Sequence, residues 1–196
     1  MDSFPSIEAV LLVGVLLAAL WVSTQSMRRR LRSSLADLEE DGWVLHGSWY
    51  ESSVRAKGTV AERAVVVELV GTVRSVLRIA VECRGKHAVR VLTPGRFSGW
   101  FNRKSILSLS GPQAVIASTN EEREFGRRLI EDNDGAELVA EFFQAASAEV
   151  VWIAQDSVLG VSRRRIRRVL KPHRMREAVL AAVGLASLVE RKSRAL

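Results

Sequence analysis

Residues 9–22 read AVLLVGVLLAALWV, a run of fourteen positions without one charged side chain. With its weakly polar flanks the run reaches about 18 residues, near the shortest helix that spans a bilayer. Trp21 lies where such a helix would meet the lipid headgroups, a position that tryptophan favours in membrane proteins. We therefore predict a transmembrane helix over residues 7–24, preceded by a short extracytoplasmic segment at residues 1–6.

A cleaved signal peptide and a buried core helix are the two alternatives for this run. A signal peptide carries positive charge before its apolar segment, whereas Asp2 and Glu8 precede the run here and the basic residues follow it. A core helix carries a polar stripe along one side, and no such stripe interrupts the run. Both features favour the membrane anchor.

Four arginines within five positions follow the run: Arg28, Arg29, Arg30 and Arg32. Positive charge beside a membrane helix stays in the cytoplasm, so we expect the N-terminus outside and the rest of the chain inside. This topology describes a bacterial single-pass protein of the inner (cytoplasmic) membrane. Together with Trp21 the arginines form the predicted membrane interface, either as an ordinary stop-transfer flank or as a site for anionic lipid.

A stem and a single domain follow the anchor. Leu31, Leu35 and Leu38 recur at helical spacing before a glycine. Residues 25–42 are therefore interpreted as a basic, amphipathic stem that ends at a glycine cap. Residues 43–196 are expected to form one cytoplasmic α+β domain, because about 150 residues suffice for one hydrophobic core.

Alternating apolar and polar residues indicate antiparallel strands in this domain. The clearest case is Ser75–Arg84, SVLRIAVECR, in which apolar side chains occupy every second position. Short runs of this kind at close spacing predict an antiparallel sheet of about five to seven strands. The other candidate strands are Trp43–Tyr50, Val54–Lys57, Val60–Val70, Ala88–Leu92, Ile106–Leu109, Ala114–Ala117, Glu149–Gln155 and Val158–Ser162.

Two helices are expected to cover this sheet. One spans Ala136–Ser147 after a turn at Asn133–Gly135, and the other runs from Pro172 to about Arg191. Proline favours the first turn of a helix, and Ala178–Val189 is too short to cross a bilayer. Trp152 is expected in or near the core. The predicted fold class is α+β: a single transmembrane helix followed by an antiparallel sheet with two covering helices.

The charge balance points to an anionic partner. The chain has 29 basic and 22 acidic side chains, a net charge of +7. Because Asp2 and Glu8 are the only charges before Arg28, the chain beyond the anchor holds 29 basic against 20 acidic side chains, or +9. This balance favours anionic lipid, an acidic protein or nucleic acid. The lone Cys83 excludes an internal disulfide and is interpreted as a buried core thiol.

The sequence contains no recognisable catalytic or cofactor-binding motif. It contains no glycine-rich phosphate loop, no pair of cysteines at zinc-ligand spacing and no G-x-S-x-G nucleophile elbow. The three histidines, His46, His87 and His173, are far apart. We therefore predict no catalytic, cofactor-binding or metal-binding residues, and we expect a protein that is not an enzyme.

Two segments stand out as docking candidates. Arg163–Arg176 is strongly basic and holds no acid, and Thr93–Ser105, TPGRFSGWFNRKS, mixes aromatic and cationic side chains. Such mixtures suit lipid headgroups and protein interfaces; a solvated basic surface and aromatics folded over the core are the alternatives. Nucleic acid is disfavoured, because no recognition motif accompanies the charge. The predicted docking residues are Phe97, Trp100, Phe101, Arg103, Lys104, Arg163, Arg164, Arg165, Arg167, Arg168 and Arg174.

These features together predict a non-catalytic, membrane-anchored accessory or scaffold subunit. It would dock on the cytoplasmic face of a larger membrane assembly in transport, respiration or photosynthesis, with other integral membrane proteins as partners and anionic lipid as a further candidate. The alternative is a membrane-tethered enzyme, or a domain that binds anionic lipid or phosphate through Arg163–Arg176.

Overall fold

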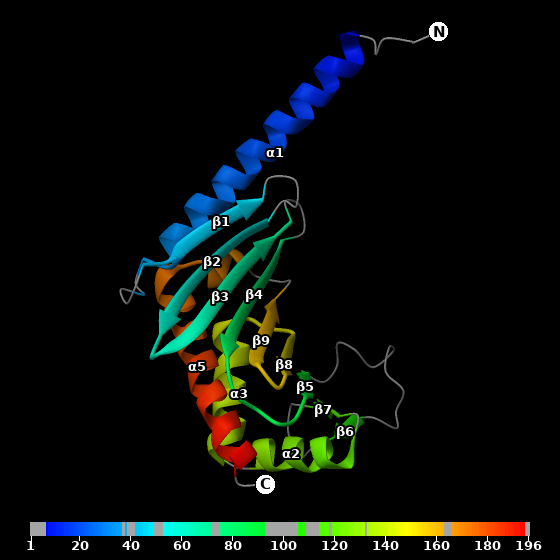
Figure 1. The fold of residues 1–196 in the computed structure, drawn as a ribbon, viewed down its shortest axis with the longest axis vertical. Coiled ribbons are helices and arrows are strands. Elements are labelled where there is room, and N and C mark those ends of the chain that lie inside the picture. The colour runs from blue at the N-terminus through cyan, green and yellow to red at the C-terminus, as the bar shows by residue number, and fades with distance from the viewer. Residues whose placement is uncertain are drawn as a thin grey trace.

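A computed structural model of the chain confirms the predicted class, an apolar N-terminal helix followed by an antiparallel sheet with further helices (Figure 1). The structure describes residues 7–36, 38, 42–48, 53–71, 75–92, 106–108, 114–117, 119–131, 133–162 and 166–194. The helices are α1 (Ile7–Ser34), α2 (Asn120–Glu131), α3 (Asn133–Ala145), α4 (Ile166–Val169) and α5 (Pro172–Arg194). The strands are β1 (Val44–Ser48), β2 (Ser53–Val60), β3 (Arg63–Val70), β4 (Val76–Glu82), β5 (Val89–Leu92), β6 (Ile106–Ser108), β7 (Ala114–Ile116), β8 (Val150–Ile153) and β9 (Ser157–Ser162).

The strands form a single open sheet in the order β1-β2-β3-β4-β9-β8-β5-β7-β6, and every neighbouring pair is antiparallel. Seven strands have four or more residues, whereas β6 and β7 have three each. The predicted hairpin after α3 is confirmed as β8 and β9. It lies in the middle of the sheet, because β9 pairs with β4.

One predicted strand boundary is wrong. The run expected as one strand from Val60 to Val70 is divided by a two-residue turn at Ala61 and Glu62, which makes β2 and β3 a hairpin. Both turn residues adopt left-handed backbone angles, with φ of 48° and 64°. Such turns usually carry glycine, asparagine or aspartate, and none of these residues marks the reversal here.

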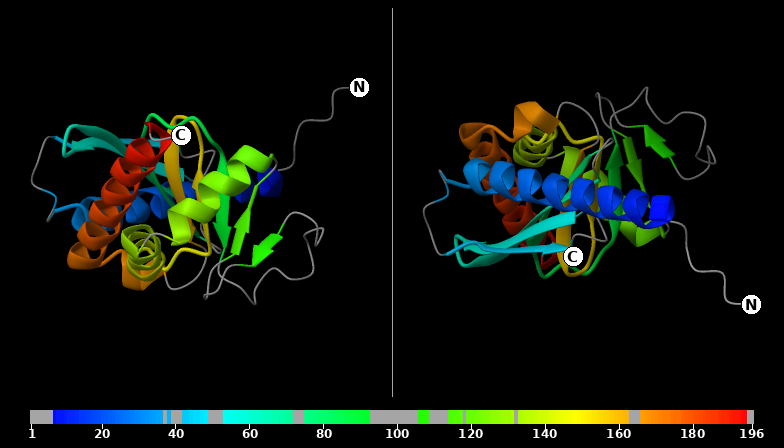
Figure 2. Two further views of the ribbon diagram at one scale, coloured as in Figure 1. Left: turned by 90° about the horizontal axis from the view of Figure 1, so that it is seen from below. Right: turned by 90° about the horizontal axis from the view of Figure 1, so that it is seen from above.

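Helices cover one face of the sheet (Figure 2). The two predicted helices, α3 and α5, are both present, and α5 lies against β4 and β9. Phe142 of α3 packs directly over Gly160 of β9, where an added Cβ would come within 2.4 Å of the ring. Two helices were not predicted. One is α2, which lies beside β5 and β7 and buries Phe125 and Leu129 completely. The other is the short helix α4.

The first helix passes through the predicted anchor and into the predicted stem without a break. Its N-terminal part stands clear of the domain, but from Thr24 onward one side packs against β1, β2 and α5 (Figure 1). Met27 and Leu31 are 6% and 0% exposed, and Leu35, just after the helix, is 3% exposed. The helix ends at Ser34, well before the glycine at which the stem was expected to end. The leucines of the stem therefore belong to the core of the domain.

Candidate docking surfaces

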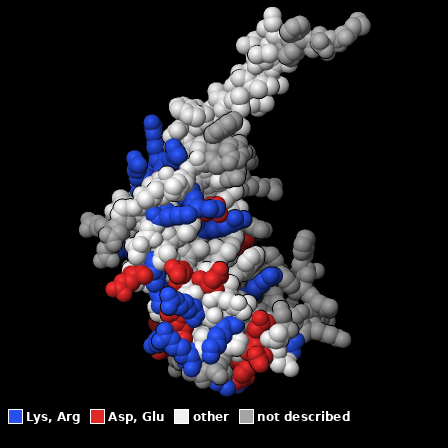
Figure 3. All heavy atoms as spheres, in the orientation of Figure 1, with Lys and Arg blue, Asp and Glu red and all other residues white. Residues whose placement is uncertain are grey.

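The free part of α1 could cross a membrane. An 18-residue window of this helix has a mean hydropathy of 2.2, and only 6% of it is buried. Eighteen residues of α-helix are about 27 Å long, close to the roughly 30 Å of a bilayer's hydrocarbon core. Glu8 lies in the first turn of the helix, and between it and Arg28 the helix has no charged side chain. In Figure 3 basic residues gather where the helix meets the domain. Trp21, 59% exposed, lies at the inner end of the apolar part.

The predicted interface arginines form a basic collar at the base of this helix, Arg28, Arg29, Arg30 and Arg32. The last three are exposed, whereas Arg28 is half-buried over β1. The Arg28 side chain lies directly over Gly47, where an added Cβ would come within 2.6 Å of the Arg28 Nε. The collar is thereby held against the sheet on one side and presents its charge on the other.

The second basic segment lies beside the collar although it is distant in the sequence. The Ser34 hydroxyl oxygen is 2.5 Å from the Leu170 carbonyl and 2.7 Å from the Arg30 carbonyl. Its single proton can serve either acceptor, and the contact places α4 at the end of α1. Ile166 and Val169 are buried there, which leaves Arg167 and Arg168 exposed.

Of the other predicted docking residues, the structure describes Arg174 alone. Arg174 is half-buried, and its Nη1 is 2.7 Å from Glu177 Oε2. The remaining docking residues lie outside the described residues and stay predictions. They are Phe97, Trp100, Phe101, Arg103, Lys104, Arg163, Arg164 and Arg165.

A third surface, the sheet face opposite the helices, was missed by the sequence analysis. On this face Glu68 of β3 accepts hydrogen bonds from Arg55 of β2 at 2.7 Å and from Arg78 of β4 at 3.1 Å. Burial raises the pKa of Glu68, but the two guanidinium groups outweigh this effect and hold it below its usual range. One carboxylate thus serves two half-exposed arginines, which leaves the cluster with a net positive charge.

Trp152 lies on this open face, so its expected place in the core is wrong. The side chain is 41% exposed, pairs across the sheet with Leu159, and stacks under the Arg90 guanidinium at 4.8 Å from the ring centroid. Its neighbours Val150 and Val161 face the same side and are half-buried. The alternation in β8 explains the error: Val151 and Ile153 occupy the core positions, which turns Trp152 outward.

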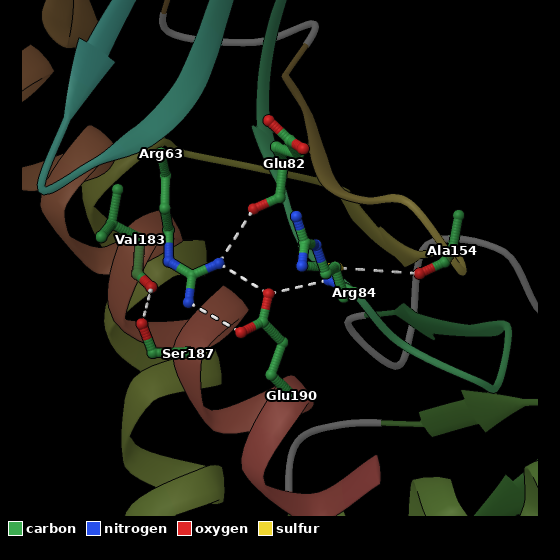
Figure 4. Close-up of polar contacts among 8 residues, drawn as sticks. Arg63, Glu82, Arg84, Ala154, Val183, Ser187 and Glu190 are labelled. Atoms are coloured by element: carbon green, nitrogen blue, oxygen red, sulfur yellow. Dashed lines mark hydrogen bonds and ion pairs between the residues drawn. The ribbon is translucent and has the colours of Figure 1, made fainter. Parts of the chain in front are cut away.

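The cluster of charged residues around Glu190 has the character of a structural ion pair. Arg63 donates two hydrogen bonds to Glu190 of α5, at 2.8 and 3.0 Å, and the Arg84 amide donates a third at 2.8 Å (Figure 4). The Arg63 bonds lower the pKa of Glu190 to about 2. Such a carboxylate is a very weak base. A cleft of about 250 Å³ opens beside this cluster. It is lined by residues of β3, β4 and α5, among them Arg63, Glu82 and Glu190.

The Cys83 thiol is similarly unreactive. Burial raises the pKa of Cys83 to about 11, which disfavours the nucleophilic thiolate. Within the described part of the chain, no group of three His, Cys, Asp or Glu side chains could hold a metal ion.

Comparison with known proteins relates the fold to one solved structure. No known protein family and no curated protein matches the chain. The fold is similar to the crystal structure of the mycobacterial trehalose monomycolate transport factor A, TtfA, with a TM-score of 0.52 and 16% sequence identity. The likeness covers 69% of this chain and 70% of that chain. At this identity it shows the fold alone.

Proposed function

We propose that this protein is a non-catalytic, membrane-anchored accessory subunit that docks on the cytoplasmic face of a larger membrane protein assembly. The observation that carries the proposal is the continuity of α1. Its outer part is apolar and bare, whereas Met27 and Leu31 are packed in the core of the domain. A domain held in this way keeps a fixed orientation to the bilayer, as a subunit needs if one surface is to meet a neighbour.

The basic collar sets the direction of the anchor in this proposal. Arg28–Arg32 on the domain side of the apolar run favours a cytoplasmic domain and an N-terminus outside the inner membrane. The exposed Arg167 and Arg168 add charge at the same level. At about 1 kcal/mol per basic residue near an anionic surface, lipid headgroups would further fix the orientation.

Transport is the favoured setting among those considered. The structurally similar protein TtfA is described as a transport factor, which supports an accessory role in transport over one in respiration or photosynthesis. The alternative function is a domain that binds anionic lipid or phosphate. It is supported by the exposure of Arg167 and Arg168 beside the collar, and it predicts binding that weakens steeply with salt.

Gentle co-purification tests the proposal. The full chain, tagged at its C-terminus, is extracted from native membranes in mild detergent, and the proteins that accompany it are quantified by mass spectrometry. An unrelated tagged single-pass protein is the control. We expect a stoichiometric set of integral membrane proteins that the control does not recover. Recovery of the chain alone, as a monomer, would overturn the subunit role and leave the lipid-binding alternative.

A further inference from the structure

We infer that the open face of the sheet binds an amphipathic helix with acidic edges, contributed by an integral membrane protein of the same assembly. This inference rests on the proposed function and names the surface and the partner chemistry through which it operates. The surface, here called the Trp152 face, comprises Trp152, Leu159, Val150 and Val161, with Arg78 and Arg90 at its borders.

The apolar centre of this face supplies an anchor for a partner. Outside α1, the large apolar side chains exposed in the described residues are Val44, Trp152 and Leu180. Trp152 is the aromatic one, and it is surrounded by half-buried aliphatic side chains on β8 and β9. Tryptophan and arginine in such surroundings contribute most strongly to protein interfaces. The stacked Arg90 also limits the rotamers of Trp152, so less entropy is lost on binding.

The width of the face fits a single helix. Arg78 lies on β4 and Arg90 on β5, and the order β4-β9-β8-β5 puts two apolar strands between them. Three strand spacings are about 14 Å, and an α-helix with its side chains is about 10–12 Å across. A helix lying along β8 and β9 would therefore rest its apolar side on Trp152 and Leu159. Its two edges would meet Arg78 and Arg90.

The charges of this face determine what those edges carry. Arg78 and Arg55 share the carboxylate of Glu68, and Arg90 and Lys57 are exposed on the same side of the sheet. The exposed Glu82 of β4 also lies on this side, so the described strands place four basic side chains against two carboxylates there. Aspartate and glutamate on the edges of the bound helix complement this surplus. Lysine and arginine there would be repelled.

Other occupants fit the face less well. A second copy stacked face to face would bring like-charged arginines together. A bilayer is also poorly placed, because β1 and β2 run along α1 (Figures 1 and 2). A membrane crossed by that helix faces strand ends such as Gly47 and Ser48 rather than the broad side of the sheet. A protein standing beside the anchor has direct access to that broad side.

Photo-crosslinking in intact cells tests the inference. The full chain carries p-benzoylphenylalanine at position 152 or, as a matched control, at position 180. Leu180 is similarly exposed, at 46%, but lies on α5. We expect position 152 to capture a segment of an integral membrane protein with acidic residues flanking an apolar stripe, and position 180 not to capture it. Arg90→Glu should lower this capture at least tenfold, and reversal of an acid in the captured segment to lysine should restore it.

The outcomes separate this inference from the proposed function. If the wild-type chain co-purifies with membrane proteins but position 152 captures only lipid, a second copy or a basic segment, the Trp152 face is not the docking surface and the subunit role stands. Unchanged capture in the Arg90→Glu variant would overturn the charge argument in the same way. If the wild-type chain co-purifies with nothing, the subunit role fails first and the inference falls with it. An unchanged unfolding midpoint for Arg90→Glu shows that the variant folds.

Discussion

Leu31→Ala distinguishes a helix that is part of the domain from a helix on a flexible stem. Leu31 lies in the predicted stem but is 0% exposed, packed in the core between α1 and the sheet. Truncation of a buried leucine leaves a cavity and costs about 2–5 kcal/mol. In a domain of this size, a loss of about 3 kcal/mol lowers the unfolding midpoint by about 6–12 °C. The measurement is thermal unfolding of the full chain in mild detergent, followed by circular dichroism.

Leu16→Ala is the matched control for this experiment. It makes the same chemical change in the same helix, at a residue that is 55% exposed and has no role in the domain core. We expect its unfolding midpoint to stay within about 1–2 °C of the wild type, since exposed substitutions change stability by about 0.5 kcal/mol or less. Equal midpoints for Leu31→Ala and the wild type would refute the reasoning. They would show that the domain folds without the base of α1, so that its orientation to the membrane is not fixed.

Three further predictions concern the interior and its ion pairs. Glu190→Gln should cost about 1–2 kcal/mol at neutral pH because it removes a partly solvated ion pair with Arg63. The pKa of Glu190 in the folded chain is about 2, below its ordinary 4.5. The stability that the ion pair contributes is therefore present above pH 4.5 and is lost as the pH falls toward 2. Urea titrations should show the unfolding free energies of the variant and the wild type converging over that pH range. Gly160→Ala should lower the free energy of unfolding by about 1–3 kcal/mol, because its Cβ would collide with Phe142. Gly14→Ala, where an added Cβ meets nothing within 4 Å, should not lower it, and equal effects of the two substitutions would contradict the packing of α3 on β9. Cys83, with a pKa of about 11, should resist a thiol reagent at pH 8 in the folded chain and react once it is denatured, whereas rapid labelling of the folded chain would argue against its burial.

Much of the fold could be predicted because single strands and helices carry local patterns. The alternation of Ser75–Arg84 predicted β4, and Pro172 marked the first residue of α5. The errors occur where long-range packing decides. Nothing local to Ala61 and Glu62 indicates a reversal, since the pairing of β2 with β3 imposes their left-handed angles. Leu31 and Leu35 showed helical spacing, but the sequence could not say that they face this sheet rather than a partner.

The docking surfaces likewise divide into features that local sequence indicates and features that depend on long-range packing. Composition alone pointed to Arg28–Arg32 and to Arg167–Arg168, but their proximity depends on the contact between Ser34 and Leu170, which are 136 positions apart. The Trp152 face was not predicted. Which side of β8 is buried follows from its place between β9 and β5, and that place depends on the order of the whole sheet. A signal was present in the alternation of Val151, Trp152 and Ile153, which puts the tryptophan opposite its two apolar neighbours.

Membrane topology tests the proposed role most directly, because a domain outside the cytoplasm could meet no cytoplasmic partner. Two variants each add one cysteine, in place of Ser3 or of the exposed Arg176. Intact cells are treated with a membrane-impermeant maleimide. The unmodified chain, whose Cys83 is buried, gives the background labelling. We predict that Ser3→Cys is labelled in intact cells and that Arg176→Cys is labelled only after permeabilisation. Labelling of Arg176→Cys in intact cells, or protection of Ser3→Cys until permeabilisation, would contradict the anchored cytoplasmic subunit.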